Sequence, residues 1–389
     1  MVPSNATNTA TTTTAATTTT TSTLKPPLPG KFLACVSSLD QAIFQEIDGL
    51  CYFMFYTVQD INQLKNKNLG LSKSKIGVDI PSSRVQANQA KLANSIATYW
   101  PTIREFAVLD LELRPGVSTY VDDVITFLKE ADTSLNTHIR AEPPPRMMFG
   151  YVLLGVAVIL QGQPPSTLMT NFNKLVQEVQ PDALLYRTSL NRNVTDPGIC
   201  RRTGPAPWKG QGMPSVQSSF LDSLRFRRAP GFQPLPLKTA ELLSVSAAAT
   251  KTAYKSPDRT RPGDAPCENV TQINPKDVVC KGGPLYKIIK NQFKILFTDP
   301  IHYDKWGSTF EYDININMDT NCTMVIKMCL AYNNFNFTGG YVIFDVHIHY
   351  LCKKPPFFVE PKGDFGLVKW ATSTIYEDYT GVECTNINC

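Results

Sequence analysis

The sequence lacks the patterns of several large enzyme classes. Its 389 residues contain no G-x-S-x-G nucleophile elbow, no P-loop and no G-x-G-x-x-G dinucleotide fingerprint. Only four histidines are present and no C-x2-C pair occurs, so a zinc site of common spacing is not expected. We therefore expect neither a cofactor nor a metal in this protein.

Charge and long apolar runs are also scarce. The net charge of +5 is mild and spread along the chain, which gives no reason to expect a nucleic-acid partner. The apolar run 147–160 is too short to span a bilayer and favours a buried strand. The first residues show no signal peptide, since a basic n-region and an apolar h-region are both missing. We expect the start to be incomplete, because the cysteines indicate export.

Cysteine, in contrast, is plentiful. Ten cysteines and five N-x-S/T sequons favour an oxidising compartment and a secreted glycoprotein. The disulfide connectivity stays open, although the close pairs Cys267/Cys280, Cys322/Cys329 and Cys384/Cys389 are geometrically plausible. The disulfide candidates are Cys35, Cys51, Cys200, Cys267, Cys280, Cys322, Cys329, Cys352, Cys384 and Cys389. The glycosylation candidates are Asn5, Asn193, Asn269, Asn321 and Asn336.

Composition divides the chain into three parts. Residues 1–30 hold a Thr/Ala tract before prolines, which predicts a disordered, mucin-like stalk or an unmodified linker. Residues 31–265 alternate strand and helix patterns, which predicts an α/β fold, a (β/α)8 TIM-like barrel. Residues 266–389 are Cys-rich with β-type runs. They form either a barrel end that includes the last strand or a small disulfide-stapled module.

Periodicity predicts the individual elements of the barrel. We expect helices over 82–99, 119–131 and 166–179. Strands are expected over 50–57, 75–80, 105–113, 146–154, 182–188 and 242–247, with further β-type runs over 310–318, 324–330 and 340–351.

The strand 105–113 carries the strongest functional signal. Strict alternation places Phe106, Val108, Asp110 and Glu112 on one face, the first two filling the barrel and the last two at its mouth. Active sites of such barrels lie at the carboxyl ends of the strands. Two carboxylates there can be an acid/base pair, or an ordinary polar strand end.

With those strands placed, the chain resembles the glycoside hydrolase family 18 chitinases and chitinase-like proteins, including secreted arthropod sets, over about residues 31–260. The family motif D-x-x-D-x-D-x-E is matched here at Glu105, Val108, Asp110 and Glu112. The resemblance implies substrate-assisted hydrolysis, with Glu112 as the acid and Asp110 orienting the acetamide of the sugar.

Two further segments carry the resemblance. Tyr186 stands where the family has a Tyr-Asp pair on the sixth strand. Residues 365–370 resemble the last strand, which implies that Trp370 stacks on substrate; residues 339–345 compete for that strand.

Departures from the family pattern predict a loss of catalysis. Val108 replaces an Asp that in the family shares a proton with its successor, so the coupled acid cluster is expected to be broken. Arg187 replaces the Asp after Tyr186 and can pair with Glu112, which would hold that acid ionised.

One polar strand face invites a metal-site interpretation. Asp345, His347 and His349 alternate along the sequence, so all three can meet one ion. A solvated polar face explains the same pattern, and we expect no metal.

Three functions remain open. The first is a secreted chitinase-like glycoprotein without catalysis that binds a chitin-type or other glycan, or an extracellular protein. The second is a weakly active β-N-acetylglucosaminide hydrolase. The third is a structural, mucin-like extracellular protein. None of them involves nucleic acid or a membrane span.

Overall fold

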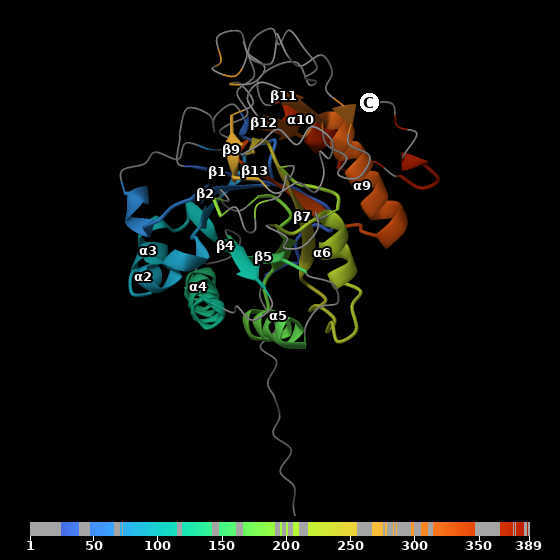
Figure 1. The fold of residues 1–389 in the computed structure, drawn as a ribbon. Helices are drawn as coiled ribbons and strands as arrows, with labels where there is room; N and C mark the ends of the chain where they lie inside the picture. The colour runs from blue at the N-terminus through green and yellow to red at the C-terminus, as the bar shows by residue number, and fades with distance from the viewer. Residues whose placement is uncertain are drawn as a thin grey trace, which may run out of the picture.

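The computed structural model describes residues 25–38, 47–65, 71, 73–114, 119–141, 148–160, 166–190, 195–196, 200, 205–209, 217–254, 267–274, 277, 283, 285, 297–298, 305–309, 314–346, 366–375, 377, 379–384 and 387. Its centre is a closed barrel of eight parallel strands surrounded by helices (Figure 1). The predicted TIM-barrel-like fold is therefore confirmed.

The barrel strands follow one another around the ring in nearly sequential order. The ring runs β1-β13-β7-β6-β5-β4-β3-β2 and closes between β2 and β1. The strands are β1 (Leu33–Ser38), β2 (Phe53–Thr57), β3 (Lys75–Asp79), β4 (Ile103–Leu113), β5 (Tyr151–Val158), β6 (Ala183–Tyr186), β7 (Ala240–Ser246) and β13 (Gly340–Phe344).

Helices cover the outside of this ring, as their amphipathic sequences require. They lie around its lower half and along one side in Figure 1. The helices are η1 (Ile61–Leu64), η2 (Ser82–Arg84), α2 (Val85–Gln89), α3 (Leu92–Tyr99), α4 (Val121–Ala141), α5 (Ser166–Val179), α6 (Phe220–Phe226), α9 (Asn321–Phe335) and α10 (Gly366–Thr374).

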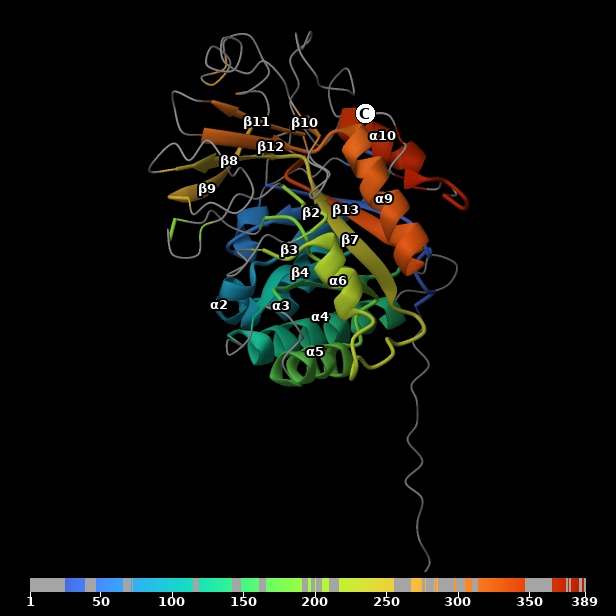
Figure 2. The same ribbon diagram turned by 45° about the vertical axis from the view of Figure 1, so that its right-hand side comes forward.

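A second, antiparallel sheet lies over one end of the barrel (Figure 2). It is inserted between β7 and α9, and its strand order is β10-β11-β12-β8-β9. Its strands are β8 (Ala249–Ala253), β9 (Asn269–Ile273), β10 (Phe297–Thr298), β11 (Lys305–Thr309) and β12 (Ile314–Met318). Because β8 follows β7 almost directly, the sheet stands at the carboxyl ends of the barrel strands.

Two C-terminal expectations were wrong. The run 324–330 was expected to be β-type but lies within α9, which begins with a Thr320/Thr323 capping box. The segment containing Trp370 was a candidate for the last strand but forms α10. The competing segment supplies the eighth strand instead, as β13. In both cases the apolar residues of a short run also fit a buried helix, so length and composition alone did not decide.

An inserted residue in β4 changes which side chains face the barrel interior. Leu109 and Asp110 together stand opposite Gly155 of β5, because Val108 pairs with Leu154 and the next partners are Leu111 and Val156. This is a β-bulge, which shifts the alternation of the strand by one residue.

Packing on the two sides of β4 follows from that bulge. Before it, Ala107 and Leu109 pack inside the barrel, whereas Phe106 and Val108 pack among the residues of the helix layer. After it, Leu111 returns to the outer layer. The expectation that Phe106 and Val108 share the inner face with Asp110 was therefore wrong, since it assumed unbroken alternation.

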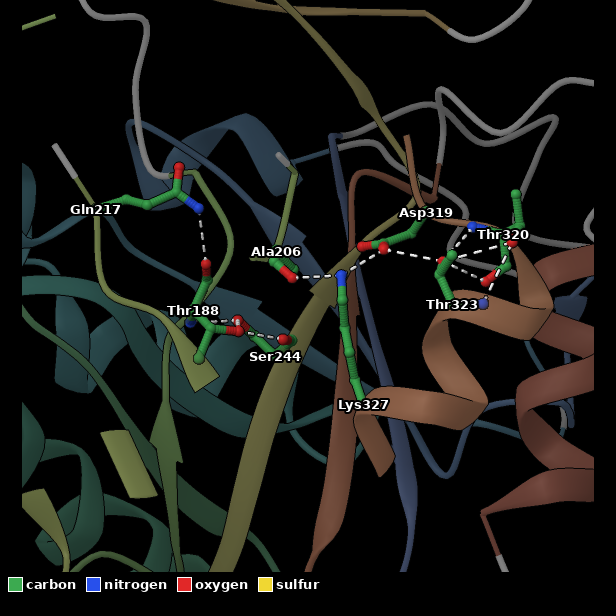
Figure 3. A network of polar contacts seen from close by, with 8 residues as sticks. All are labelled: Thr188, Ala206, Gln217, Ser244, Asp319, Thr320, Thr323 and Lys327. Carbon is green, nitrogen blue, oxygen red and sulfur yellow. Dashed lines mark hydrogen bonds and ion pairs between the residues drawn. The ribbon is translucent and has the colours of Figure 1, made fainter. Parts of the chain in front are cut away.

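The inserted sheet and α9 are joined by a buried ion pair. Figure 3 shows Lys327 of α9 reaching Asp319, which follows β12, and the carbonyl of Ala206. Its Nζ lies 2.5 Å from Asp319 Oδ1 and 2.6 Å from Ala206 O, and both charged side chains are fully buried. Beside it, Thr188 binds Ser244 and Gln217, which links the ends of β6 and β7.

The opposite end of the barrel is closed by the segment that precedes β1. Leu28 packs into the barrel interior. Lys25 is buried, and its Nζ lies 2.5 Å from Asp132 Oδ1 and 3.0 Å from Asp182 Oδ2. The carboxylate of Asp182 also accepts from the N–H of Val152 at the start of the strands. These contacts fix residues 25–32 against the amino ends of the strands.

Three disulfides are present in the described part of the chain, and they correct the expected pairs. Cys35 pairs with Cys51, Cys200 with Cys267 and Cys329 with Cys384, with Cα–Cα distances of 5.9, 5.1 and 5.6 Å. Distant rather than close cysteines are joined, because the fold brings them together. Cys322 is also disulfide-bonded. Cys280, Cys352 and Cys389 lie outside the described residues.

The bulge depends on Gly155. A Cβ at this position would lie 2.6 Å from Leu109 Cα and 2.7 Å from Leu109 O, both backbone atoms that cannot turn away. We predict that Gly155→Ala lowers the free energy of unfolding by about 1–3 kcal/mol, the usual cost of overpacking. Chemical denaturation measures this, with Gly30→Ala as the control, since a Cβ at Gly30 meets nothing within 4 Å. Equal stabilities of the two variants would contradict the prediction.

A buried carboxyl in the barrel interior makes stability depend on pH. Glu105 is fully buried, and its oxygens make no hydrogen bond of normal geometry with the described residues. Burial raises its pKa to about 8 from the usual 4.5. The folded state therefore binds the proton of Glu105 more tightly than the unfolded state does. The stability that this proton contributes is lost as pH rises from about 4.5 to about 8.

Glu105→Gln removes this proton linkage while keeping the side-chain shape. We predict that the variant gains stability relative to the parent protein as pH rises between 5 and 8, by a few kcal/mol. Urea denaturation of both proteins across that range measures the difference. A difference that is the same at both ends of the range would show that Glu105 does not titrate there.

Candidate functional site

A cavity of about 420 Å³ opens at the carboxyl ends of the barrel strands. Six barrel strands, or the residues directly after them, form most of its wall, and η2 and β9 of the inserted sheet complete it. Its lining residues are Val36, Ser37, Ser38, Thr57, Gln59, Asp79, Pro81, Ser83, Asp110, Arg187, Gln272, Phe344 and Asp345. This is the position where barrels of this type place their functional sites.

Asp79, the last residue of β3, is the most deeply buried acid of the cavity wall. Its Oδ1 accepts from the N–H of Leu109 at 3.0 Å, and its Oδ2 accepts from Thr57 Oγ1 at 2.8 Å. Sequence analysis missed it, although its position at the carboxyl end of a strand was a usable signal.

Asp110, in the bulge of β4, lies on the same wall. The backbone N–H of Ser82, at the start of η2, donates to its Oδ1 at 2.6 Å. The prediction that Asp110 faces the barrel mouth is confirmed, for a different reason than expected. The bulge turns it there, whereas unbroken alternation from Ala107 and Leu109 would have pointed it outward.

Asp79 and Asp110 influence each other's protonation. Burial, followed by the charge of Asp110, raises the pKa of Asp79 to about 7. Burial also raises the pKa of Asp110, while Arg187 and the hydrogen bonds from Ser82 lower it. Two neighbouring carboxyls cannot both ionise freely, so Asp79 keeps its proton up to about pH 7. The acid pair expected to be lost with Val108 is thus formed by a residue of the neighbouring strand.

Arg187 provides the positive charge of the cavity. Its guanidinium lies 4.1 Å over the ring of Phe344, and its Nη1 donates to the carbonyl of Leu109 at 3.1 Å. The Nε proton is buried and has no acceptor among the described residues. Burial lowers the pKa of Arg187, and the charges of Asp110, Asp79 and Asp345 oppose that shift.

Asp345 follows β13 and completes the ring of acids. Its backbone has φ = +60°, a left-handed conformation that Asp tolerates better than most residues. Its Oδ2 accepts from Ser246 Oγ at 2.7 Å and from Gln272 Nε2 at 3.1 Å. Gln272 also donates to the carbonyl of Leu190, so edge strand β9 is fixed to the barrel mouth.

Glu112 is on the same side of β4 as Asp110 but is not part of the cavity lining. Its Oε2 lies 2.8 Å from Arg114 Nη2, and the two side chains are 19% and 22% exposed. The expected partner of Glu112 was Arg187. Instead Arg114, two residues along the strand, makes the ion pair.

Tyr186, the catalytic candidate that the resemblance implied on the sixth strand, is not brought to this cavity. It faces the helix layer, where its ring stacks on Phe172 and its hydroxyl donates to Glu241 Oε1 at 3.0 Å. Leu185 and Arg187 face inward on β6, so Tyr186 between them faces outward. Trp370 belongs to α10, and its side chain is outside the described part.

Other expected sites fall partly outside the described residues. Asn5, Asn193, His347 and His349 are outside them, as is the side chain of Asn321. Asn336 is exposed as the C-cap of α9, and Asn269 is half-buried on β9. The described residues include no cluster of His, Cys, Asp and Glu that could hold a metal ion. None of their helices combines the length and apolar character needed to cross a membrane.

Comparison by sequence identifies no relative. No protein-family model matches the chain, and no curated protein matches it.

Comparison by structure finds the fold of family 18 glycoside hydrolases. Human YKL-39, a pseudo-chitinase with retained chitooligosaccharide-binding properties, matches with a TM-score of 0.60 and 14% identity over 89% of this chain and 100% of that chain. Class V chitinase from Nicotiana tobaccum matches with a TM-score of 0.58 and 13% identity, over 89% of this chain and 99% of that chain. A family 18 N-acetylglucosaminidase from Paenibacillus barengoltzii matches with a TM-score of 0.53 and 10% identity, over 88% of this chain and 99% of that chain. At these identities the likeness establishes the fold.

The coupling between the two buried acids can be measured directly. We predict that Asp79 titrates near pH 7 and that Asp110→Asn lowers its pKa, because a neighbouring negative charge is removed. Carboxyl-carbon NMR of aspartate-labelled protein follows this titration. Asp123→Asn, on α4, is the control and should leave the pKa of Asp79 unchanged. An Asp79 pKa that Asp110→Asn does not lower would contradict the coupling.

Proposed function

We propose that the barrel mouth binds a carbohydrate and does not hydrolyse it. One observation carries the proposal. Arg187 is only 8% exposed, yet only one hydrogen bond from its five N–H donors is found in the described part of the chain. Four carboxylates act on it electrostatically, those of Asp110, Asp79, Asp345 and Glu112, but no ion pair within 4.0 Å joins any of them to Arg187 in the described part of the chain. Buried donors of this kind are usually satisfied, so the arrangement favours a ligand.

A hydroxylated ligand fits those gaps. A hydroxyl accepts a hydrogen bond from the guanidinium and donates one to a carboxylate, so it can bridge the two. Asp345 and the Asp79/Asp110 pair flank Arg187, which offers several such bridges within one cavity. A sugar carries several hydroxyls on a rigid ring and can use them together.

Loss of hydrolysis follows from the position of Glu112. Substrate-assisted cleavage needs a protonated acid that reaches the glycosidic oxygen. Glu112 makes an ion pair with Arg114 at 2.8 Å, and it is not part of the cavity lining. The binding of chitooligosaccharides by the pseudo-chitinase YKL-39 is a precedent for this separation of binding from catalysis on the same fold.

We further propose that the protein works outside the cell or in the secretory pathway. Three disulfides support this, since such bonds persist in oxidising compartments. The exposed sequon at Asn336 is the one best placed for glycosylation.

A glycan array and a titration test the binding proposal. We expect retention of at least one oligosaccharide, and Arg187→Lys should weaken its binding about tenfold or more, because the charge remains but the planar set of donors is lost. Arg140→Met is the control, since Arg140 is exposed on α4. Thermal melts of both variants establish that they fold. No glycan retained by the folded parent protein would refute the proposal.

A fluorogenic chito-oligosaccharide tests the absence of hydrolysis. We expect no release of the fluorophore by the parent protein or by Glu112→Gln across pH 4 to 8. Turnover by the parent protein that Glu112→Gln abolishes would instead establish a hydrolase with Glu112 as its acid.

A further inference from the structure

The charges around the cavity do not cancel. Among the described lining residues, Asp79, Asp110 and Asp345 are acidic and Arg187 is the basic one. Burial raises the pKa of Asp79 to about 7 and also raises that of Asp110, so protonation lowers the charge of this pair near neutral pH. The described lining still has acidic groups in excess of basic ones, and the nearby Glu112–Arg114 pair is neutral as a whole.

Asp345 has a free acceptor on this wall. Both of its hydrogen bonds from described residues, those from Ser246 and Gln272, go to Oδ2. Its Oδ1 accepts none from the described residues, and the residue lines the cavity. Since the two donors fix the carboxylate in place, Oδ1 is a preorganised acceptor that a ligand can use at little cost in side-chain entropy.

The same cavity offers little apolar surface for the methyl group of an N-acetyl group. Phe344 is the aromatic residue among its described lining residues, and the guanidinium of Arg187 covers that ring at 4.1 Å. Val36 and Pro81 are the other apolar members of the lining. An acetyl methyl group would thus meet mainly carboxylates. It would displace water from them without donating a hydrogen bond, and that loss costs free energy.

We propose that the cavity selects sugars with a free amino group over their N-acetylated forms, with Asp345 as the acceptor for the ammonium. This inference rests on the proposed carbohydrate binding and specifies its ligand class. An ammonium supplies three donors and a positive charge to a wall that has acceptors and negative charge in excess. Acetylation removes the charge and two of those donors, and adds a methyl group.

Calorimetric titration with two matched ligands tests the selectivity. The probes are the tetramers of glucosamine and of N-acetylglucosamine, at a pH where the amines are protonated. We expect the glucosamine tetramer to bind about tenfold more tightly or better, the difference between a charge-assisted and a neutral hydrogen bond. Equal affinities, or a preference for the acetylated tetramer, would overturn the inference while leaving the proposed carbohydrate binding intact. Binding of neither tetramer or any other glycan would defeat both.

Asp345→Asn then assigns the preference to one residue. Asparagine tolerates the left-handed backbone at this position and keeps the shape of the side chain, so the fold should be retained. We expect the variant to lose most of the tenfold preference for the glucosamine tetramer over the acetylated tetramer. Asp123→Asn on α4 is the matched control and should keep the preference. A preference that survives Asp345→Asn would show that Asp345 is not the ammonium acceptor.

Discussion

The bulge at Leu109 and Asp110 is the constraint on which the candidate site depends. It frees the backbone of Leu109 to bind side chains, so its N–H donates to Asp79 and its carbonyl accepts from Arg187. It also turns Asp110 into the mouth. This one bulge thus positions Asp79, Asp110 and Arg187 on the cavity wall. Gly155 permits it, because any side chain there would meet the backbone of Leu109.

Much of the fold could be predicted from periodicity, whereas the site could be predicted only in part. The strand and helix patterns up to residue 247 predicted six of the first seven barrel strands, all but β1, and α5 matches its expected bounds Ser166–Val179. Alternation failed at one place, β4, because a period of two cannot show an inserted residue. The consequence was large: Val108 was assigned to the interior, and Asp79, which ends β3, was not considered as a partner for Asp110.

Placements that came from short motifs were less reliable than those from periodicity. Tyr186 matches a family position in the sequence, but the inward neighbours on β6 force it toward the helices. Trp370 was assigned to a strand, and its segment folds as α10. A motif of one or two residues does not determine which face of a strand a side chain occupies, or that a strand forms at all. Disulfides that join residues as distant as Cys200 and Cys267 also depend on the completed fold.

The three buried cations in the described part of the chain differ in a way that bears on function. Lys327 lies 2.5 Å from Asp319, and Lys25 lies within 3.0 Å of two aspartates. Both pairs join separate elements, and direct contact compensates the cost of removing the charges from water. Arg187 has three aspartates around it and direct ion contact with none in the described structure. A cation needed only to hold the barrel together would be expected to contact its carboxylates directly, as the two lysines do. A buried cation without such contacts among the described residues, on the wall of a cavity, is what a site for a polar ligand requires.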